Sequence, residues 1–430
     1  MLNNQSLNYK VEAWDMFQHI FKVKSINDHT LHFVAVLGEK LDLERLKQAV
    51  NLSADSFPLI RSSFNETQNK SYWEDKRYTA DDMVKVLETS NTDKSVNEFI
   101  CKEIDALNGP QLKIAVVRGD KNDTLCVLIN HMICDAAGFK EYLYMLSDIY
   151  SNIEENSYYP SVSMRNRKIS QILKVFSMHD KLKIMFSKND MLSLDPAKFQ
   201  LEGNLNNPFI EIRTLSKEHF CQIKTYAKKH GATVNDVILT AYIRVLFQIF
   251  GRVITTTCAL DMRKYLPNRK AEGICNLSTN LNCNIGSEIG KEFEQTLIKV
   301  KNTMDKEKSN IACIKSINLL EKLFDILPYK VIRNIVKEKF ANPFIAFTNI
   351  GILDKKRLAF GKVEITKAYM TGSIKYSPYF QLAISTFDDQ AVFSVNLYGT
   401  QADRNTISVF LDKLIQELNI CYIMIQYKSK

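Results

Sequence analysis

One histidine in this sequence lies where a side chain can act on a bound molecule. His131 directly follows an apolar stretch, residues 124–129, that is typical of a buried strand, and Asp135 follows four residues later at an expected helix start. Side chains between a strand end and a helix N-terminus commonly line ligand sites in α/β proteins. An imidazole can take a proton from an alcohol, amine or thiol at neutral pH. The spacing alone favours a core histidine held by hydrogen bonds over a general base, and both interpretations stay open at this point.

Other catalytic signatures are absent from the sequence. Residues 286–290 read Gly-Ser-Glu-Ile-Gly, which is the wrong order for a G-x-S-x-G nucleophile turn, and neither glycine-rich phosphate motif occurs. The seven histidines are too dispersed for a zinc motif. We therefore expect chemistry without a metal, without a bound cofactor and without a covalent serine intermediate.

Strand-like and helix-like segments that would position these side chains alternate through both halves of the chain. A helix is expected from Ala136 and another over residues 233–250, where Thr233 and Asp236 have the spacing of a capping box. The expected strands cover residues 30–37, 112–118, 124–129, 209–215, 253–260, 344–350, 379–387 and 392–397. This alternation predicts an α/β fold.

One strand–turn–helix order occurs twice. Residues 124–150 run from an apolar strand through a short turn into an amphipathic helix, and residues 391–418 repeat that order. The first copy has His131 at its strand exit, whereas the second has Tyr398 and Gly399. We predict two lobes of similar construction with the chemistry in one of them.

Length and composition agree with two globular lobes. A chain of 430 residues exceeds what one compact core usually holds, and 45% apolar with 24% charged residues is ordinary globular composition. The net charge of +9 is compatible with an anionic substrate or partner and too weak to indicate nucleic acid. We divide the chain into an N-terminal lobe at 1–165, a crossover at 166–205 and a C-terminal lobe at 206–430.

The expected environment is cytoplasmic. The nine cysteines are odd in number and scattered, which indicates reduced thiols, and the N-terminus shows no signal peptide. No stretch is long and apolar enough to span a bilayer, and we expect a monomer. Residues 168–188 mix apolar and lysine residues, which suits a helix across the lobe junction or one at a membrane surface.

Five segments, in order along about 300 residues, resemble the condensation-domain and chloramphenicol-acetyltransferase-like superfamily. The stretch Asn130-His131-Met132-Ile133-Cys134-Asp135-Ala136-Ala137-Gly138 resembles its H-H-x-x-x-D-G motif. The other four segments are Ser56-Phe57-Pro58-Leu59-Ile60-Arg61-Ser62-Ser63-Phe64, Asn235-Asp236-Val237-Ile238, Asp261-Met262-Arg263 followed by Gly273-Ile274-Cys275-Asn276, and Thr348-Asn349-Ile350-Gly351. Two positions depart from the family motif: Asn130 replaces its first histidine, and Ala136 replaces its glycine.

The resemblance implies a fold and a reaction. Two pseudo-symmetric lobes would form a V with a central tunnel, in which an acyl thioester meets an alcohol or amine acceptor. His131 would be the catalytic base, and Asp135 would pair with Arg263, or in reserve with Arg61, to hold the loop. Thr348, Asn349 and Asn130 are candidates for contact with the substrate or the oxyanion, although strand-end hydrogen bonding explains Thr348 and Asn349 equally well.

Three functions remain open at this point. The first is an acyltransferase that uses acyl-CoA, or a phosphopantetheine thioester on an acyl or peptidyl carrier protein, as co-substrate. The second is a free-standing condensation domain of nonribosomal peptide or polyketide biosynthesis that forms an amide or ester. The third is a relative that binds a carrier protein or ligand without catalysis.

Overall fold

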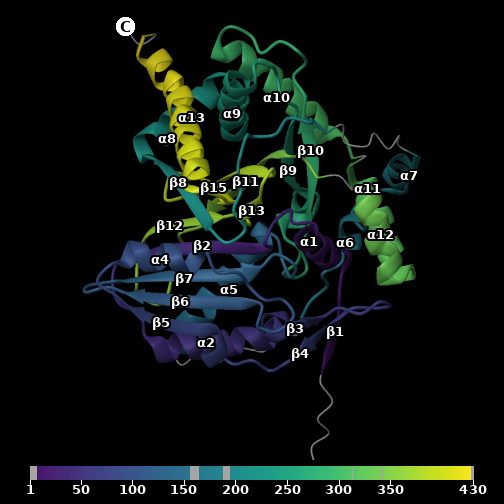
Figure 1. Cartoon of the computed structure of the whole chain (residues 1–430), viewed down its shortest axis with the longest axis vertical. Coiled ribbons are helices and arrows are strands. Elements are labelled where there is room, and N and C mark those ends of the chain that lie inside the picture. The colour runs from purple at the N-terminus through teal and green to yellow at the C-terminus, as the bar shows by residue number, and fades with distance from the viewer. Residues whose placement is uncertain (1–6, 155–163, 187–193, 312, 340–341, 428–430) are drawn as a thin grey trace, which may run out of the picture.

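The computed structural model describes residues 7–154, 164–186, 194–311, 313–339 and 342–427. The chain has an α/β fold in two lobes, each built on a sheet with helices packed against it (Figure 1). The V-shaped junction between the lobes is expected to hold a tunnel, and that tunnel stays a prediction.

The N-terminal lobe is a five-stranded sheet in the order β12-β2-β7-β6-β5. Its strands are β2 (Thr30–Leu37), β5 (Val84–Glu88), β6 (Leu112–Arg118), β7 (Asp123–Asn130) and β12 (Ile365–Thr371). Its helices are α1 (Ala13–Val23), α2 (Leu43–Ser56), α3 (Ala80–Met83), α4 (Thr92–Ile100) and α5 (Ala136–Glu154). A small sheet of β1 (Asn8–Lys10), β3 (Ser62–Asn65) and β4 (Tyr72–Asp75) lies beside it.

Strand β7 is buried along its whole length because both faces of its sheet are covered. Val127 belongs to the core on the side of α2 and α5, while its neighbours Cys126 and Leu128 pack with Phe99 of α4 on the other face. A strand buried on both faces is continuously apolar, as the sequence of β7 is. The strand therefore provides a rigid support for His131, the residue that follows it.

The C-terminal lobe is a seven-stranded sheet in which β8 pairs with β15 at one side of the path β10-β9-β11-β14-β15-β13. Its strands are β8 (Pro208–Leu215), β9 (Thr256–Asp261), β10 (Ser278–Cys283), β11 (Ile345–Leu353), β13 (Lys375–Tyr376), β14 (Phe380–Phe387) and β15 (Gln390–Tyr398). Its helices are α8 (Lys217–Lys229), α9 (Val234–Phe250), α10 (Phe293–Ser309) and α13 (Gln401–Tyr427). Helix α11 (Cys313–Ile326) follows α10, and α12 (Tyr329–Lys339) packs its buried residues Tyr329, Ile332 and Val336 into the core of the N-terminal lobe. Helix α9 begins at the expected capping box of Thr233 and Asp236.

One strand crosses the sequence division between the lobes. Strand β12 lies within residues 206–430, yet it pairs antiparallel with β2 and forms the edge of the N-terminal sheet (Figure 1). It covers a strand edge that would otherwise expose unpaired backbone groups. The two lobes are therefore joined by main-chain hydrogen bonds as well as by side chains.

The repeated strand–turn–helix order is present in both lobes. Strand β7 leads into α5, and β15 leads into α13, which packs on α8, α9 and β8. The apolar positions expected on the first helix, among them Phe139 and Leu146, are fully buried. This agreement confirms the α/β class with two similarly built lobes.

The crossover is tied to the N-terminal lobe by a buried ion pair. Arg167 donates to both carboxylate oxygens of Asp15, at 3.0 and 2.7 Å, and Trp73 donates to the same carboxylate at 2.9 Å. The helices α6 (Ser170–Leu173) and α7 (Met178–Phe186) follow, and Ile172 and Ile184 pack with Met262 of the second lobe. This packing supports the lobe-junction alternative for residues 168–186; residues 187 and 188 lie outside the described residues.

In the described part of the chain, no single helix is long and apolar enough to cross a membrane; only α8 and α9 taken together pass that test, and they are bent by 102°.

We predict that Arg167→Met lowers the free energy of unfolding by about 3–5 kcal/mol, because it leaves the carboxylate of Asp15 buried without its cation. Thermal unfolding followed by circular dichroism measures the loss. The double variant Asp15→Asn with Arg167→Met removes both charges and should recover part of the stability. A double variant less stable than Arg167→Met alone would contradict this assignment.

Candidate active site

His131 follows the last residue of β7 and begins the turn to α5. Its backbone N–H donates to the carbonyl of His29 at 2.7 Å, which extends the pairing of β7 with β2 by one residue. The side chain is half-buried, and no hydrogen bond to its Nε2 is formed by the described residues. The backbone of His131 is thus fixed at a strand end, and Nδ1 of its ring is buried without a hydrogen-bond partner in the described residues.

Asp135 connects this turn to the second lobe through an ion pair and hydrogen bonds. One carboxylate oxygen accepts from Arg263 Nη1 at 2.9 Å and from the backbone N–H of Leu277 at 2.7 Å. The other accepts from the N–H of Gly138 at 2.8 Å, in the first turn of α5. Burial would raise the pKa of Asp135, but the charge and hydrogen bond of Arg263, with the two N–H donors, hold that pKa below its ordinary value.

Arg263 is itself fixed by further partners. It donates to the carbonyl of Cys275 at 2.8 Å and to the carboxylate of Asp261 at 3.1 Å. Burial disfavours its charge, yet Asp135 and the neighbouring groups raise its pKa above the ordinary value. The structure therefore pairs Asp135 with Arg263, whereas Arg61 bonds to Asp75 and Asp55 instead.

Two side chains for which the sequence predicted no role hold the carbonyls of the turn. Asn276 Nδ2 donates to the carbonyls of His131 and Met132, both at 3.0 Å. Arg167 of the crossover donates to the carbonyl of Ile133 at 3.1 Å. Two parts of the chain that are far from the turn in sequence thus fix its successive carbonyls. Asn276 lies in one of the segments that resemble the family, residues 273–276, whereas no sequence pattern singled out Arg167.

The surroundings of His131 keep its ring neutral at pH 7. Burial lowers the pKa of His131 below its ordinary value and the charge of Lys375 lowers it further. The carbonyl of His131 itself, the charge of Asp135 and the side chain of Asn276 act in the opposite direction and are outweighed. A neutral imidazole is the form that can accept a proton.

Asn130, which replaces the first histidine of the family motif, is fully buried and supports the turn. Its Nδ2 donates to Gln111 Oε1 at 2.6 Å, and its Oδ1 accepts from the N–H of Met132 at 2.8 Å. Both ends of the amide therefore take part in hydrogen bonds within the protein, and contact of Asn130 with a substrate stays a prediction.

Thr348 and Asn349 lie on β11 and make no hydrogen bond to the His131 turn among the described residues. Thr348 is half-buried, and Asn349 is exposed. Asn349 donates to Asn235 Oδ1 at 3.0 Å and accepts from the N–H of Gly351 at 2.9 Å, where the pairing with β14 is irregular. A substrate or oxyanion role for these two residues stays a prediction.

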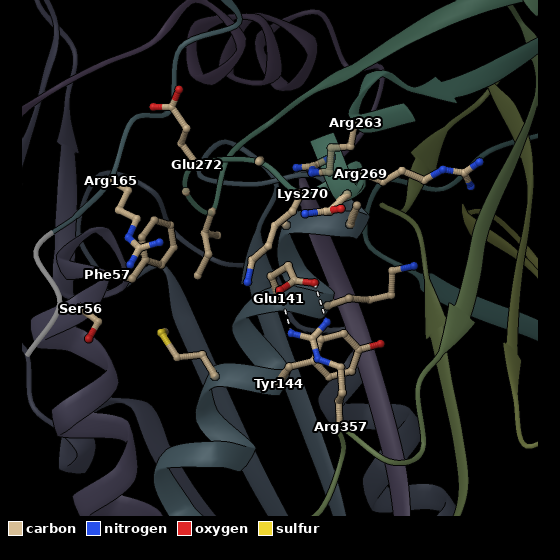
Figure 2. Close-up of a pocket in the computed structure, with 18 of the residues that line it drawn as sticks. Ser56, Phe57, Glu141, Tyr144, Arg165, Arg263, Arg269, Lys270, Glu272 and Arg357 are labelled. Carbon is tan, nitrogen blue, oxygen red and sulfur yellow. Dashed lines mark hydrogen bonds and ion pairs between the residues drawn. The ribbon is translucent and has the colours of Figure 1, made fainter. Parts of the chain in front are cut away.

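A cavity of about 570 Å³ is lined in part by Arg263, the partner of Asp135 (Figure 2). Its wall includes Gly138 of α5, Arg263, and the segment 268–274. The charge of Arg357 is balanced by the carboxylate of Glu141, to which Arg357 donates two hydrogen bonds of 2.9 Å each. Arg165, Arg269 and Lys270 also line the cavity, and within the described ranges no carboxylate pairs with them. The wall thus carries cationic groups without internal partners.

No group of three or more His, Cys, Asp or Glu side chains suited to a metal ion occurs among the residues that the structure describes.

Comparison with known proteins decides the family of this chain. The condensation-domain family model matches residues 19–257, more than half of the sequence. The chain belongs to the condensation-domain family. Its matched range includes β7, the His131 turn and α5, whereas Arg263 and Asn276 lie beyond it.

Solved structures of this fold cover almost the whole chain. The first condensation domain of the calcium-dependent antibiotic synthetase, in complex with a substrate analogue, is 12% identical, with a TM-score of 0.70 over 97% of this chain and 97% of that one. The polyketide synthase associated protein 5 from Mycobacterium tuberculosis is 11% identical, with a TM-score of 0.66 over 96% and 99%. The TRI3 trichothecene 15-O-acetyltransferase from Fusarium sporotrichioides is 12% identical, with a TM-score of 0.68 over 96% and 94%. No curated protein sequence matches this chain.

Gly138 is required where α5 passes the second lobe. A Cβ at this position would lie 2.8 Å from the carbonyl oxygen of Cys275 and 2.9 Å from Cys134 Cβ. We predict that Gly138→Ala lowers the free energy of unfolding by about 1–3 kcal/mol, because backbone must shift to admit the methyl group. Thermal unfolding measures the change. Gly38→Ala is the control, since its nearest neighbour would be 3.6 Å away. Equal midpoints for the Gly138→Ala and Gly38→Ala variants would contradict the close approach.

Asn276 is expected to position His131 without touching the substrate. Asn276→Ala removes two hydrogen bonds to the turn and a group that raises the pKa of His131. We predict that kcat falls about 10- to 100-fold and that the acid limb of the kcat profile moves to lower pH. Asn280→Ala is the matched control on β10. An unchanged acid limb in Asn276→Ala would show that Asn276 does not act on the imidazole.

Proposed function

We propose that this protein is an acyltransferase that moves an acyl group from a thioester to an alcohol or amine, with His131 as general base. The observation that carries the proposal is the neutral, half-buried imidazole on a turn that both lobes fix, in a chain of the condensation-domain family. Rigid placement of a base against two bound substrates supplies much of the rate enhancement in such a reaction.

The proposed reaction is direct transfer. The free electron pair of His131 Nε2 takes the proton of the acceptor O–H or N–H as the acceptor oxygen or nitrogen attacks the thioester carbonyl. A C–O or C–N bond forms, the C–S bond breaks, and the leaving thiolate takes the proton from the imidazolium. A thioester is already activated, so no acyl-enzyme intermediate is needed. General-base assistance of this kind contributes about 10²–10⁴ in rate.

Asp135 does not relay the proton in this scheme. Its carboxylate is directed at Arg263, Leu277 N–H and Gly138 N–H. Its role is to hold the turn, and its charge favours the imidazolium that forms in the transition state.

A phosphate-bearing donor, either acyl-CoA or a carrier-bound phosphopantetheine thioester, is proposed as co-substrate. The cationic side chains of Arg165, Arg269 and Lys270 at the cavity beside Arg263 support an anionic donor (Figure 2). Free phosphopantetheine thioesters and acyl-CoA share the phosphate groups that such a wall would bind.

The amide-forming alternative uses the same chemistry with a different acceptor. A free-standing condensation enzyme would take an amine and a carrier-bound donor, whereas an alcohol acyltransferase would take a hydroxyl. The structural neighbours include named examples of both a condensation domain and an acetyltransferase. The acceptor therefore has to be settled by assay.

We predict that His131→Ala abolishes thiol release from a panel of acyl-CoA and acyl-pantetheine donors offered with mixed alcohols and amines. In the wild type, activity should fall as the pH drops through the lowered pKa of His131, because protonation removes the base. The half-maximal rate on the acid side is therefore expected below pH ~6.5. A coupled thiol assay measures both effects.

His179→Ala is the matched control, since His179 is exposed on α7. Unchanged turnover by His131→Ala would overturn the mechanism. Tight binding of a phosphopantetheine compound by the wild type, without product from any donor, would favour the non-catalytic alternative.

A further inference from the structure

A lysine of the second lobe lies close to the His131 turn without an ionic partner. Lys375 is half-buried in β13, and no described residue forms an ion pair or hydrogen bond with its Nζ. Lys22 provides the contrast, because it is paired with Glu103 and donates to the hydroxyl of Tyr376 at 2.8 Å. A partly buried ammonium without a partner is costly in a resting protein unless a ligand supplies the opposite charge.

Backbone contacts fix Lys375 relative to His131. Residue 375 is bridged antiparallel to Asn27, and the flanking N–H of Ile374 donates to Asp28 Oδ1 at 2.9 Å. Two residues beyond Asn27, the carbonyl of His29 accepts from the N–H of His131 at 2.7 Å. One short segment, residues 27–29, therefore contacts both the lysine and the catalytic turn.

The electrostatics agree with this placement. The charge of Lys375 is among the groups that lower the pKa of His131, after burial. Burial lowers the pKa of Lys375 to about 8, and Asp28 opposes that shift. The lysine therefore remains largely protonated at pH 7, and its charge is felt at the imidazole.

The joining segment also leaves buried polar atoms unsatisfied. Asp28 Oδ2 and His29 Nδ1 are buried and have no hydrogen-bond partner in the described protein, and Ser373 Oγ, two residues before Lys375, is in the same state. His29 has a left-handed backbone, with φ of 51°, which is uncommon for a residue other than glycine. Unsatisfied buried polar atoms of this kind indicate a missing polar ligand or water.

We propose that Lys375 binds a carboxylate of the acyl acceptor, so that the acceptor of this enzyme is an amino acid or hydroxy acid. The proposal rests on the acyl transfer proposed above and names its acceptor class. A lysine on a flexible stem binds an anionic group as a point charge, which suits a carboxylate of the ground-state substrate. With the carboxylate bound, the opposing charge beside His131 is neutralised, which eases proton uptake by the imidazole.

The test compares matched acceptor pairs that differ only in the carboxylate. Phenylalanine is paired with phenylalanine amide, and mandelate with methyl mandelate, each with the best thioester donor. In the wild type we expect kcat/KM to favour the acid of each pair. Lys375→Met should lower kcat/KM for the acids by about 10- to 100-fold, mainly through KM, and leave the amide and ester unchanged. Lys367→Met, on the exposed face of β12, is the control.

Two outcomes of the kinetic test overturn the proposal. The first is no preference for the acids in the wild type. The second is an equal loss for acids and neutral analogues in Lys375→Met, which would indicate a role in the transition state or in folding. Circular dichroism establishes that the variant is folded.

Direct binding separates this proposal from the proposed function. Calorimetry with His131→Ala measures binding of the four compounds without turnover. Acid binding that Lys375→Met removes from this background supports the subsite even if no thioester donor is turned over. Equal binding of acids and neutral analogues, or no binding of either, overturns it.

Discussion

Asp135 is charged inside the protein because Arg263 reaches it from the other lobe at 2.9 Å. Its remaining oxygen positions are filled by the N–H groups of Leu277, also from the second lobe, and Gly138, from the helix that follows the turn. If the lobes separated, the buried carboxylate of Asp135 would lose both the guanidinium of Arg263 and the N–H of Leu277. A broken buried pair of this kind costs about 3–5 kcal/mol, so the position of His131 depends on the lobes staying together.

The same contacts give Asp135 and His131, the acidic and the basic side chain of the turn, different roles. Asp135 is directed into the protein, and in the proposed reaction its role is to hold the turn in place. His131 is half-buried, and burial lowers the pKa of its imidazole. Asn276 holds the carbonyl of His131 and opposes part of that lowering. The candidate site therefore consists of the imidazole proposed as the base and a shell of residues that restrict its position.

Local sequence patterns predicted the elements that carry the site but not all the contacts that fix it. Strand β2 and the capping box of α9 could be predicted because strand propensity and capping are local properties. Strand β12 was missed, since its place in the N-terminal sheet depends on the free edge of β2, some 330 residues earlier in the chain.

The candidate site shows the same limit. Spacing and family resemblance together singled out His131, Asp135 and Arg263. Asn276 and Lys375 have no diagnostic spacing, and what they contact becomes visible only when residues more than a hundred positions apart are brought together. Asn130 forms hydrogen bonds with Gln111 and with the turn itself, contacts that no sequence pattern predicted, and its contact with a substrate stays a prediction.

The second lobe contains a counterpart of the Asp135 arrangement without the histidine. At the turn from β15 to α13, Asp403 is buried and accepts from the backbone N–H groups of Glu202 and Gly203, at 2.8 and 2.9 Å, and of Thr400 at 2.8 Å. In both lobes, a carboxylate at the start of the helix thus fixes the preceding turn by hydrogen bonds. In the second lobe this carboxylate also binds the end of the crossover. Backbone amides satisfy Asp403 within one lobe, whereas Asp135 needs a guanidinium from the other. Only the first turn therefore depends on contact between the lobes, and it is the turn that carries the proposed base.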